Sequence, residues 1–188
     1  VGPWSSGLRD SVLASTAGCA RAARSALQDG VAGSLSSGMH HARSDSGFGL
    51  CTFNGLALAA WEFHSLGAER VLVVDLDAHG GGGTREILAT AGHRWVQSVD
   101  VATSEFDTYP TSAKWRLSVV KEASAYLPTV AAMMDEAVAS FEPDAVVYNA
   151  GMDPQEGCDL GGLEGVTTEM LHRRDRRVLQ RFRAVPVA

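Results

Sequence analysis

Three side chains that can bind a metal ion follow an apolar run at alternate positions. The apolar residues 71–74 lead directly into Asp75, Asp77 and His79. Side chains alternate between the two faces of a strand, so these three would share one face. Glycines at positions 80–83 end the strand and let the backbone approach a ligand closely. The pattern predicts a metal site; the alternative is a strand exit with turn-forming aspartates and a surface histidine.

A second apolar run ends in an acid in the same way. Residues 145–151 precede Asp153, and parallel strands bind ligands at their carboxyl ends, so Asp153 is predicted to converge on Asp77 and His79. Taken alone, Asp153 before Pro154 would be a turn residue. One histidine nitrogen and two carboxylate oxygens leave an open coordination position, as catalytic zinc sites do. Fe(II) and Mn(II) also suit these ligands.

A pair of histidines, His40 and His41, lies in the glycine- and serine-rich segment 33–51. This segment is too irregular for the interior of a helix or strand, and long loops in compact domains tend to be functional. A single histidine there would be a surface residue. Two histidines in a chain with a candidate metal strand favour proton transfer in catalysis.

The hydrophobic pattern predicts helices and strands that alternate along the chain. Such alternation is typical of a parallel sheet with helices on both faces. Residues 102–117 are expected to be loop, and Ser98 and Asp100 should share one face of their strand. The expected helices cover residues 8–28, 54–66, 84–90, 124–141 and 168–183, and the expected strands begin at residues 71, 95 and 145.

Composition places the chain among globular proteins and limits its partners. The 188 residues are 45% hydrophobic and 20% charged, enough for one domain with a sizeable core. A formal charge of −6 argues against direct nucleic-acid binding, and the arginines between positions 173 and 183 are expected to form a solvated helix face. Three cysteines without Cys-x-x-Cys spacing predict neither disulfides nor a thiolate zinc site, which fits the cytoplasm. No apolar run approaches the ~20 residues of a membrane span.

Four blocks of the sequence, in order, resemble the zinc-dependent histone deacetylase superfamily, which includes acetylpolyamine amidohydrolases and acetoin-utilisation proteins. The blocks are Gly38–Ala42, Gly49–Asn54, Val71–Thr84 and Asn149–Asp153. The resemblance implies an arginase/deacetylase-like α/β fold, with three α/β/α layers around a mainly parallel sheet. It also implies removal of acetyl groups from acetyl-lysine or acetylated polyamines. By position, it assigns zinc to Asp77, His79 and Asp153, catalysis to His40 and His41, and a structural potassium ion to Asp75 and Ser98, with Asp75 also supporting His40.

Three positions depart from the family pattern. Gly80 replaces a second histidine, Gly82 stands where an Asp or Asn can orient the second histidine of the catalytic pair, and Leu50 replaces a phenylalanine of the substrate tunnel. The two glycines support an alternative function, a non-catalytic deacetylase-like scaffold that binds metal.

The chain begins at Val1 rather than Met and ends at Ala188. Residues 1–188 are therefore expected to be the central part of a single histone deacetylase-like domain, incomplete at both ends. The tyrosine that the family supplies after its next strand is absent, so this chain alone is expected to bind metal yet to be a poor deacetylase.

Overall fold

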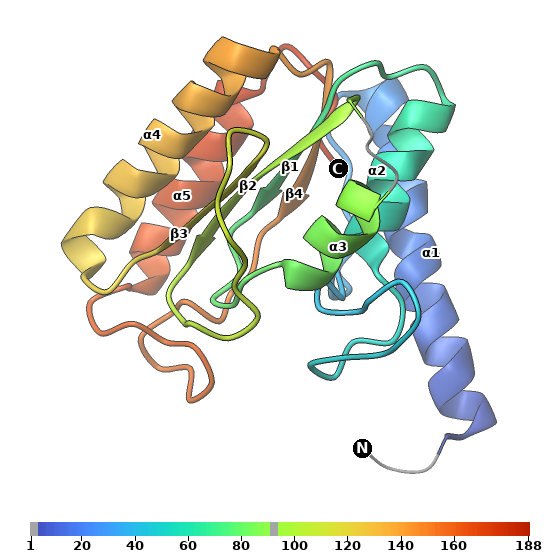
Figure 1. The fold of residues 1–188 in the computed structure, drawn as a ribbon, viewed down its shortest axis with the longest axis horizontal. Coiled ribbons are helices and arrows are strands. Elements are labelled where there is room, and N and C mark those ends of the chain that lie inside the picture. The colour runs from blue at the N-terminus through green and yellow to red at the C-terminus, as the bar shows by residue number, and fades with distance from the viewer. Residues whose placement is uncertain (1–3, 91–93) are drawn as a thin grey trace.

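A single parallel sheet is the centre of the computed structural model, which describes residues 4–90 and 94–188. The sheet has four strands in the order β3-β2-β1-β4 (Figure 1). Since all pairs are parallel, the carboxyl ends of the strands lie along one edge. The strands are β1 (Val71–Asp75), β2 (Val96–Ala102), β3 (Trp115–Val119) and β4 (Ala145–Asn149).

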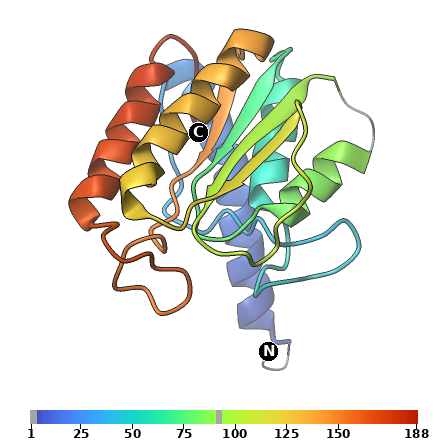
Figure 2. The same cartoon turned by 60° about the vertical axis from the view of Figure 1, so that its left-hand side comes forward.

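Helices cover both faces of the sheet and make three layers. One face carries α1 (Ser6–Asp29), α2 (Gly55–Ser65) and α3 (Gly82–Thr90), and the other carries α4 (Ala123–Phe141) and α5 (Thr168–Arg181) (Figures 1 and 2). The predicted α/β/α fold with a parallel sheet is confirmed.

The strand β1 supplies side chains to both hydrophobic clusters. Val71 and Val73 pack with residues of α1 and α2, whereas Leu72 and Val74 pack with residues of α4 and α5. All four are fully buried. Because both faces of β1 are covered by helices, both sets of alternating side chains are apolar. Residues 71–74 are therefore apolar at every position.

Side-chain caps determine where several helices begin. Asn54 precedes α2, and its side-chain oxygen accepts a hydrogen bond from the backbone N–H of Ala57 at 2.8 Å. Thr167 caps α5 in the same way through Met170 N–H. The predicted helices are confirmed within a few residues. In α4, Pro128 is the sixth residue and lies inside the helix, beyond the first turn where it was expected.

Two local predictions were wrong. Residues 102–117 are not all loop, because β3 begins at Trp115 and pairs with β2, with Trp115 opposite Ser98. The strand β1 ends at Asp75, so the period-two argument does not reach Asp77 and His79. These two residues lie in the irregular segment that follows the strand.

The final residues extend the sheet beyond β4. Val187 forms parallel bridges with Val146 and Val31, and Ala188 exchanges backbone hydrogen bonds with β4. All three cysteines are free in the structure. Among the helices in the described ranges, none has both the length and the apolar character required to cross a bilayer.

Candidate metal centre and catalytic pocket

Three donor side chains meet just beyond the carboxyl ends of β1 and β4. Nδ1 of His79 lies 3.1 Å from Oδ1 of Asp77 and 3.0 Å from Oδ2 of Asp153. The ligand atoms of the three residues all lie within 4.8 Å of one another. The structure thus brings together the three predicted metal ligands, although Asp153 lies more than 70 positions after the other two.

These three side chains lie beyond the paired strands, and hydrogen bonds with the backbone fix their positions. The N–H of His79 donates to Oδ1 of Asp77 at 2.9 Å, a local turn that brings the two side chains to the same side of the segment. The N–H of Ala78 donates to Oδ1 of Asp153 at 2.9 Å and ties the two strand ends together. Nε2–H of His79 donates to the carbonyl of Leu160 at 3.1 Å, which leaves Nδ1 as the nitrogen that faces the carboxylates of Asp77 and Asp153.

The pKa values of the two carboxylates of this centre are shifted in opposite directions. Burial would raise the pKa of Asp77, but hydrogen bonds from His40 and His79 outweigh it and lower that pKa. Burial, followed by the nearby charge of Asp77, raises the pKa of Asp153. The pKa of His79 is raised, mainly by its hydrogen bond with Asp77. The centre therefore concentrates negative charge in a partly buried volume, which favours a cation.

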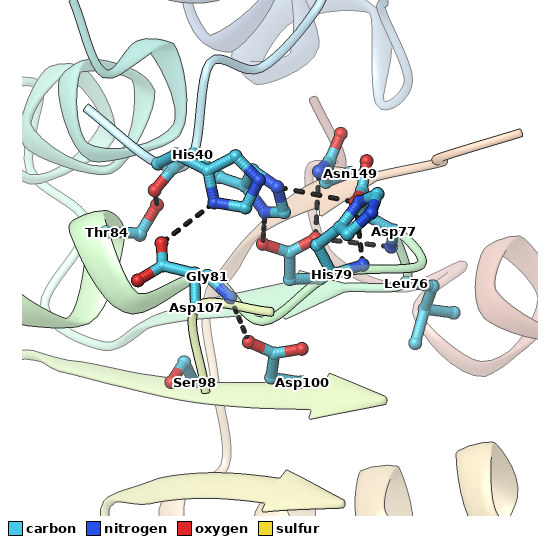
Figure 3. A network of polar contacts seen from close by, with 12 residues as sticks. His40, Leu76, Asp77, His79, Gly81, Thr84, Ser98, Asp100, Asp107 and Asn149 are labelled. Carbon is cyan, nitrogen blue, oxygen red and sulfur yellow. Dashed lines mark hydrogen bonds and ion pairs between the residues drawn. The ribbon is translucent and has the colours of Figure 1, made fainter. Parts of the chain in front are cut away.

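His40 lies beside the same centre and is held by Asp75. Its Nδ1 lies 2.7 Å from Oδ2 of Asp75, and its Nε2 lies 3.3 Å from Oδ1 of Asp77 (Figure 3). Nδ2 of Asn149, from the end of β4, donates to the other oxygen of Asp75 at 2.8 Å. Burial would lower the pKa of His40, but the charges and hydrogen bonds of Asp75 and Asp77 raise it well above the ordinary value.

His41 packs against His40 but has a different carboxylate partner. The two rings lie 4.1 Å apart between centroids, and Nδ1 of His41 lies 2.8 Å from Oδ2 of Asp107. Asp107 belongs to the segment after β2, and sequence analysis did not identify it. The signal that could have found it is weak: an aspartate after Phe106 in a segment that was read as loop.

One cavity of about 430 Å³ joins the histidine pair to the metal donors. The rings of Phe48 and Phe106 stack with centroids 5.3 Å apart, and each also meets the ring of His41 edge-on. Leu50, at the position of the expected tunnel phenylalanine, also lines this cavity and is largely exposed. The cavity is lined by Ser37, His40, His41, Gly49, Leu50, Cys51, Asp77, His79, Ser104, Phe106, Asn149, Asp153 and Leu160.

The residues predicted to hold potassium lie beneath the metal centre. Asp75 is buried at the end of β1, and Ser98 is buried within the neighbouring strand β2, opposite Val73. Asp100 lies beside them, and its Oδ2 accepts a hydrogen bond from Gly81 N–H at 2.6 Å. Its buried Oδ1 has no hydrogen-bond partner among the described residues. Burial and then the charge of Asp75 raise the pKa of Asp100 well above the ordinary value, so a cation fits this acidic pair.

Arg174 of α5 is fully buried, which corrects the prediction that this arginine belongs to a solvated face. Its Nη1 donates to the carbonyl of Leu76 at 3.1 Å and to the carbonyl of Gly151 at 2.6 Å. Leu76 directly precedes Asp77, and Gly151 lies two residues before Asp153. Arg174 thus links the two backbone segments that carry the candidate metal ligands.

The sequence is similar to those of known proteins over almost its whole length. Residues 2–187 match the histone deacetylase domain family. An uncharacterized protein of Picosynechococcus is 33% identical over 180 residues, which cover 94% of this chain and 59% of that protein. Histone deacetylase 2 of Arabidopsis thaliana is 29% identical over 168 residues, which cover 85% of this chain and 42% of that protein.

Solved structures share the fold at low sequence identity. The acetylpolyamine aminohydrolase from Burkholderia pseudomallei aligns with a TM-score of 0.76 and 23% identity, over 92% of this chain and 54% of that chain. The HD domain of HDA15 aligns with a TM-score of 0.73 and 21% identity, again over 92% and 54%. The chain therefore spans about half the length of the proteins that it matches.

Proposed function

Since this chain belongs to the histone deacetylase domain family, we propose that it hydrolyses acetyl amides with the help of a bound zinc ion. The observation that carries the proposal is the convergence of Asp77, His79 and Asp153 beside the His40–His41 pair in one cavity. The proposed substrates are the acetylated side chain of lysine or an acetylated polyamine. The products would be acetate and a free amine.

The donor set supports zinc as the metal. Asp77, His79 and Asp153 offer two oxygens and one nitrogen, and a centre with three protein ligands keeps a position open for reaction. The carbonyl of Leu160 accepts from the far nitrogen of His79, as outer partners of metal-bound histidines commonly do. Zinc in this position would polarise an acetyl carbonyl and lower the pKa of a water molecule to about 7.

The two histidines are proposed to move protons between water and the leaving amine. Nδ1 of His41 faces Asp107, so its Nε2 is left for proton transfer. His40 has Asp75 at Nδ1 and Asp77 at 3.3 Å from Nε2, so its Nε2 lies directly beside a proposed metal ligand. One ring would accept a proton from the attacking water. A protonated ring would then donate to the amine nitrogen as the C–N bond breaks.

The cavity wall supports a substrate with an aliphatic chain and an acetyl amide at its end. Phe106 lines the cavity beside His41 and offers a flat apolar surface against which methylene groups can pack, with the ring of Phe48 stacked on it. Both lysine and polyamine side chains have this shape. Asp75 and Ser98 are proposed to hold a potassium ion that supports the segment beneath His40, with the unpaired oxygen of Asp100 beside it.

Zinc content and acetate release, measured on the same preparation, test this proposal. Loss of a residue that only hydrogen-bonds to a metal ligand typically weakens metal binding by about 10–100-fold. Asp153→Ala removes a proposed ligand itself, so zinc binding should weaken by at least roughly that factor. His40→Ala should lower turnover of an acetyl-lysine peptide or an acetylated polyamine by roughly 10²–10⁴-fold and keep the zinc. Asp10→Ala, at an exposed position in α1, is the matched control.

Two outcomes would overturn parts of the proposal. Full zinc occupancy in Asp153→Ala would remove this residue from the metal centre. Stoichiometric zinc without turnover of either substrate, in a protein that also carries the tyrosine-bearing segment, would favour the alternative function, a metal-binding scaffold. If His40→Ala and His41→Ala each lost only a fewfold in turnover, the pair would not carry the protons.

A further inference from the structure

We propose that Asp107 is the positioning residue of His41, supplied from the segment after β2 to a histidine of the loop before α2. This inference rests on the proposed function of the His40–His41 pair and adds a residue to it. Asp107 lies 66 positions away from His41 in sequence. Its carboxylate nevertheless lies inside the pocket wall, with 3% of the side chain exposed.

The contact between Asp107 and His41 determines which ring nitrogen carries the proton. Oδ2 of Asp107 lies 2.8 Å from Nδ1 of His41, and a carboxylate can only accept, so Nδ1–H donates. Neutral His41 then has its lone pair on Nε2, the nitrogen that can take a proton from water. The same carboxylate stabilises the imidazolium that forms when His41 becomes protonated.

The glycines at 80 and 82 provide the space for this carboxylate. A Cβ at position 82 would lie 2.4 Å from Oδ1 of Asp107, and a Cβ at position 80 would lie 2.5 Å from its backbone oxygen. Gly80 N–H also donates to the carbonyl of Phe106 at 2.8 Å and holds the segment there. The two departures from the family pattern therefore have one physical explanation. Asp107 fills the volume where side chains at 80 and 82 would lie.

Two further features, the contact with Arg43 and the backbone conformation of Asp107, indicate that the fold holds Asp107 in this position. The guanidinium of Arg43 pairs with Oδ1 of Asp107, so the two carboxylate oxygens have separate partners. Asp107 adopts a left-handed backbone with φ of 56°, a conformation that residues with a Cβ seldom adopt, although aspartate does so more often than most. Glu86 lies 3.7 Å from Arg43 and extends the chain of charges to α3. Strain in a buried, fully partnered aspartate is typical of a functional position.

Asp107→Asn is the variant that tests this role, because asparagine retains the size and tolerates left-handed backbone. The amide can donate to Nδ1 and so favour the wrong tautomer of His41. We expect kcat to fall by roughly 10²–10⁴-fold, with KM within about twofold and zinc content unchanged. Asp45→Asn, an exposed position in the histidine loop, should leave all three quantities unchanged.

Nitrogen-15 NMR of the histidine side chains gives a readout that does not require turnover. In the unsubstituted protein, neutral His41 should be protonated at Nδ1, and Asp107→Asn should shift it toward the Nε2–H tautomer. This result would stand even if neither proposed substrate were hydrolysed. Observation of the Nε2–H tautomer in the unsubstituted protein would overturn the proposal. A kcat within twofold of the unsubstituted value, or a loss of kcat matched by a loss of zinc, would also overturn it.

Discussion

Replacement of the buried Arg174 by methionine should destabilise the fold and loosen the metal centre together. The substitution keeps an apolar stem but removes Nη1, which donates to the buried carbonyl of Leu76 and to the partly buried carbonyl of Gly151. A buried acceptor that loses its partner costs about 1–3 kcal/mol, so two full losses of this kind set an upper range of about 2–6 kcal/mol. This range is a large part of the roughly 5–15 kcal/mol that stabilises an ordinary domain.

The other contacts of the Arg174 guanidinium determine where in that range the loss in the free energy of unfolding should fall. Nε of Arg174 also pairs with Asp175 at 2.8 Å, and Asp175 still accepts from the hydroxyl of Tyr148 at 2.6 Å after the substitution. The hydroxyl of Tyr126 lies 3.3 Å from Nη1, a long contact that adds little. We therefore expect a loss of about 4 kcal/mol in the free energy of unfolding.

Equilibrium urea unfolding measures this loss. With a slope of about 2 kcal/mol per molar urea, the midpoint of Arg174→Met should fall by about 2 M. Arg176→Met, at an exposed position of the same helix, should change the free energy of unfolding by less than about 0.5 kcal/mol. Zinc affinity, measured below the unfolding transition, should fall for Arg174→Met and not for the control.

Either of two results would refute this reasoning. A midpoint within about 0.3 M of the unsubstituted protein would mean that the two carbonyls are satisfied without the guanidinium. A large loss of stability with unchanged zinc affinity would mean that Arg174 stabilises the core but does not position the segments of Asp77 and Asp153.

Two further substitutions test how the histidine loop and the glycine segment are held. Asn54→Asp keeps the oxygen that caps α2 but loses the amide that donates to two carbonyls of the histidine loop at 3.1 and 3.2 Å. Turnover should therefore fall at least tenfold, while thermal unfolding followed by helix content shows α2 intact. Equal losses for Asn54→Asp and Asn54→Ala in helix content would contradict that separation. Gly82→Ala should destabilise the protein by about 1–3 kcal/mol because its Cβ overlaps Asp107, whereas Gly33→Ala has open space and should be neutral in the same thermal melts.

Local sequence patterns predicted the elements whose signals lie within a few residues. The run 71–74 is apolar at every position, and Asn54 directly precedes an apolar helix, so both elements were found near their true bounds. The strand β3 carries the alternation of a half-buried strand, with Arg116 and Ser118 between apolar neighbours. It was missed because it is only five residues long, follows a polar segment and lies at the edge of the sheet.

The same distinction applies to the site. His40, His41 and the three metal donors have side chains whose chemistry is evident from type and spacing, and the structure places all five around one cavity. Asp107 and Arg174 were not recognised because their roles arise from contacts across 66 and 98 positions. An aspartate in a loop and an arginine in a basic helix are ordinary surface residues until the fold buries them.

The electrostatic balance of the pocket explains why so many polar groups lie at one end of the sheet. Asp75, Asp77, Asp100 and Asp153 are close together, and a group of buried carboxylates is costly unless cations or hydrogen bonds compensate. The raised pKa values of Asp100 and Asp153 record that cost, and the raised pKa of His40 records partial compensation by a proton. Cation binding at this centre would lower all three pKa values. A bound cation would remove this repulsion, so the unfavourable free energy of bringing the carboxylates together adds to the affinity for a cation. Arg174 links the segments that carry Asp77 and Asp153 and prevents them from moving apart to relieve the repulsion.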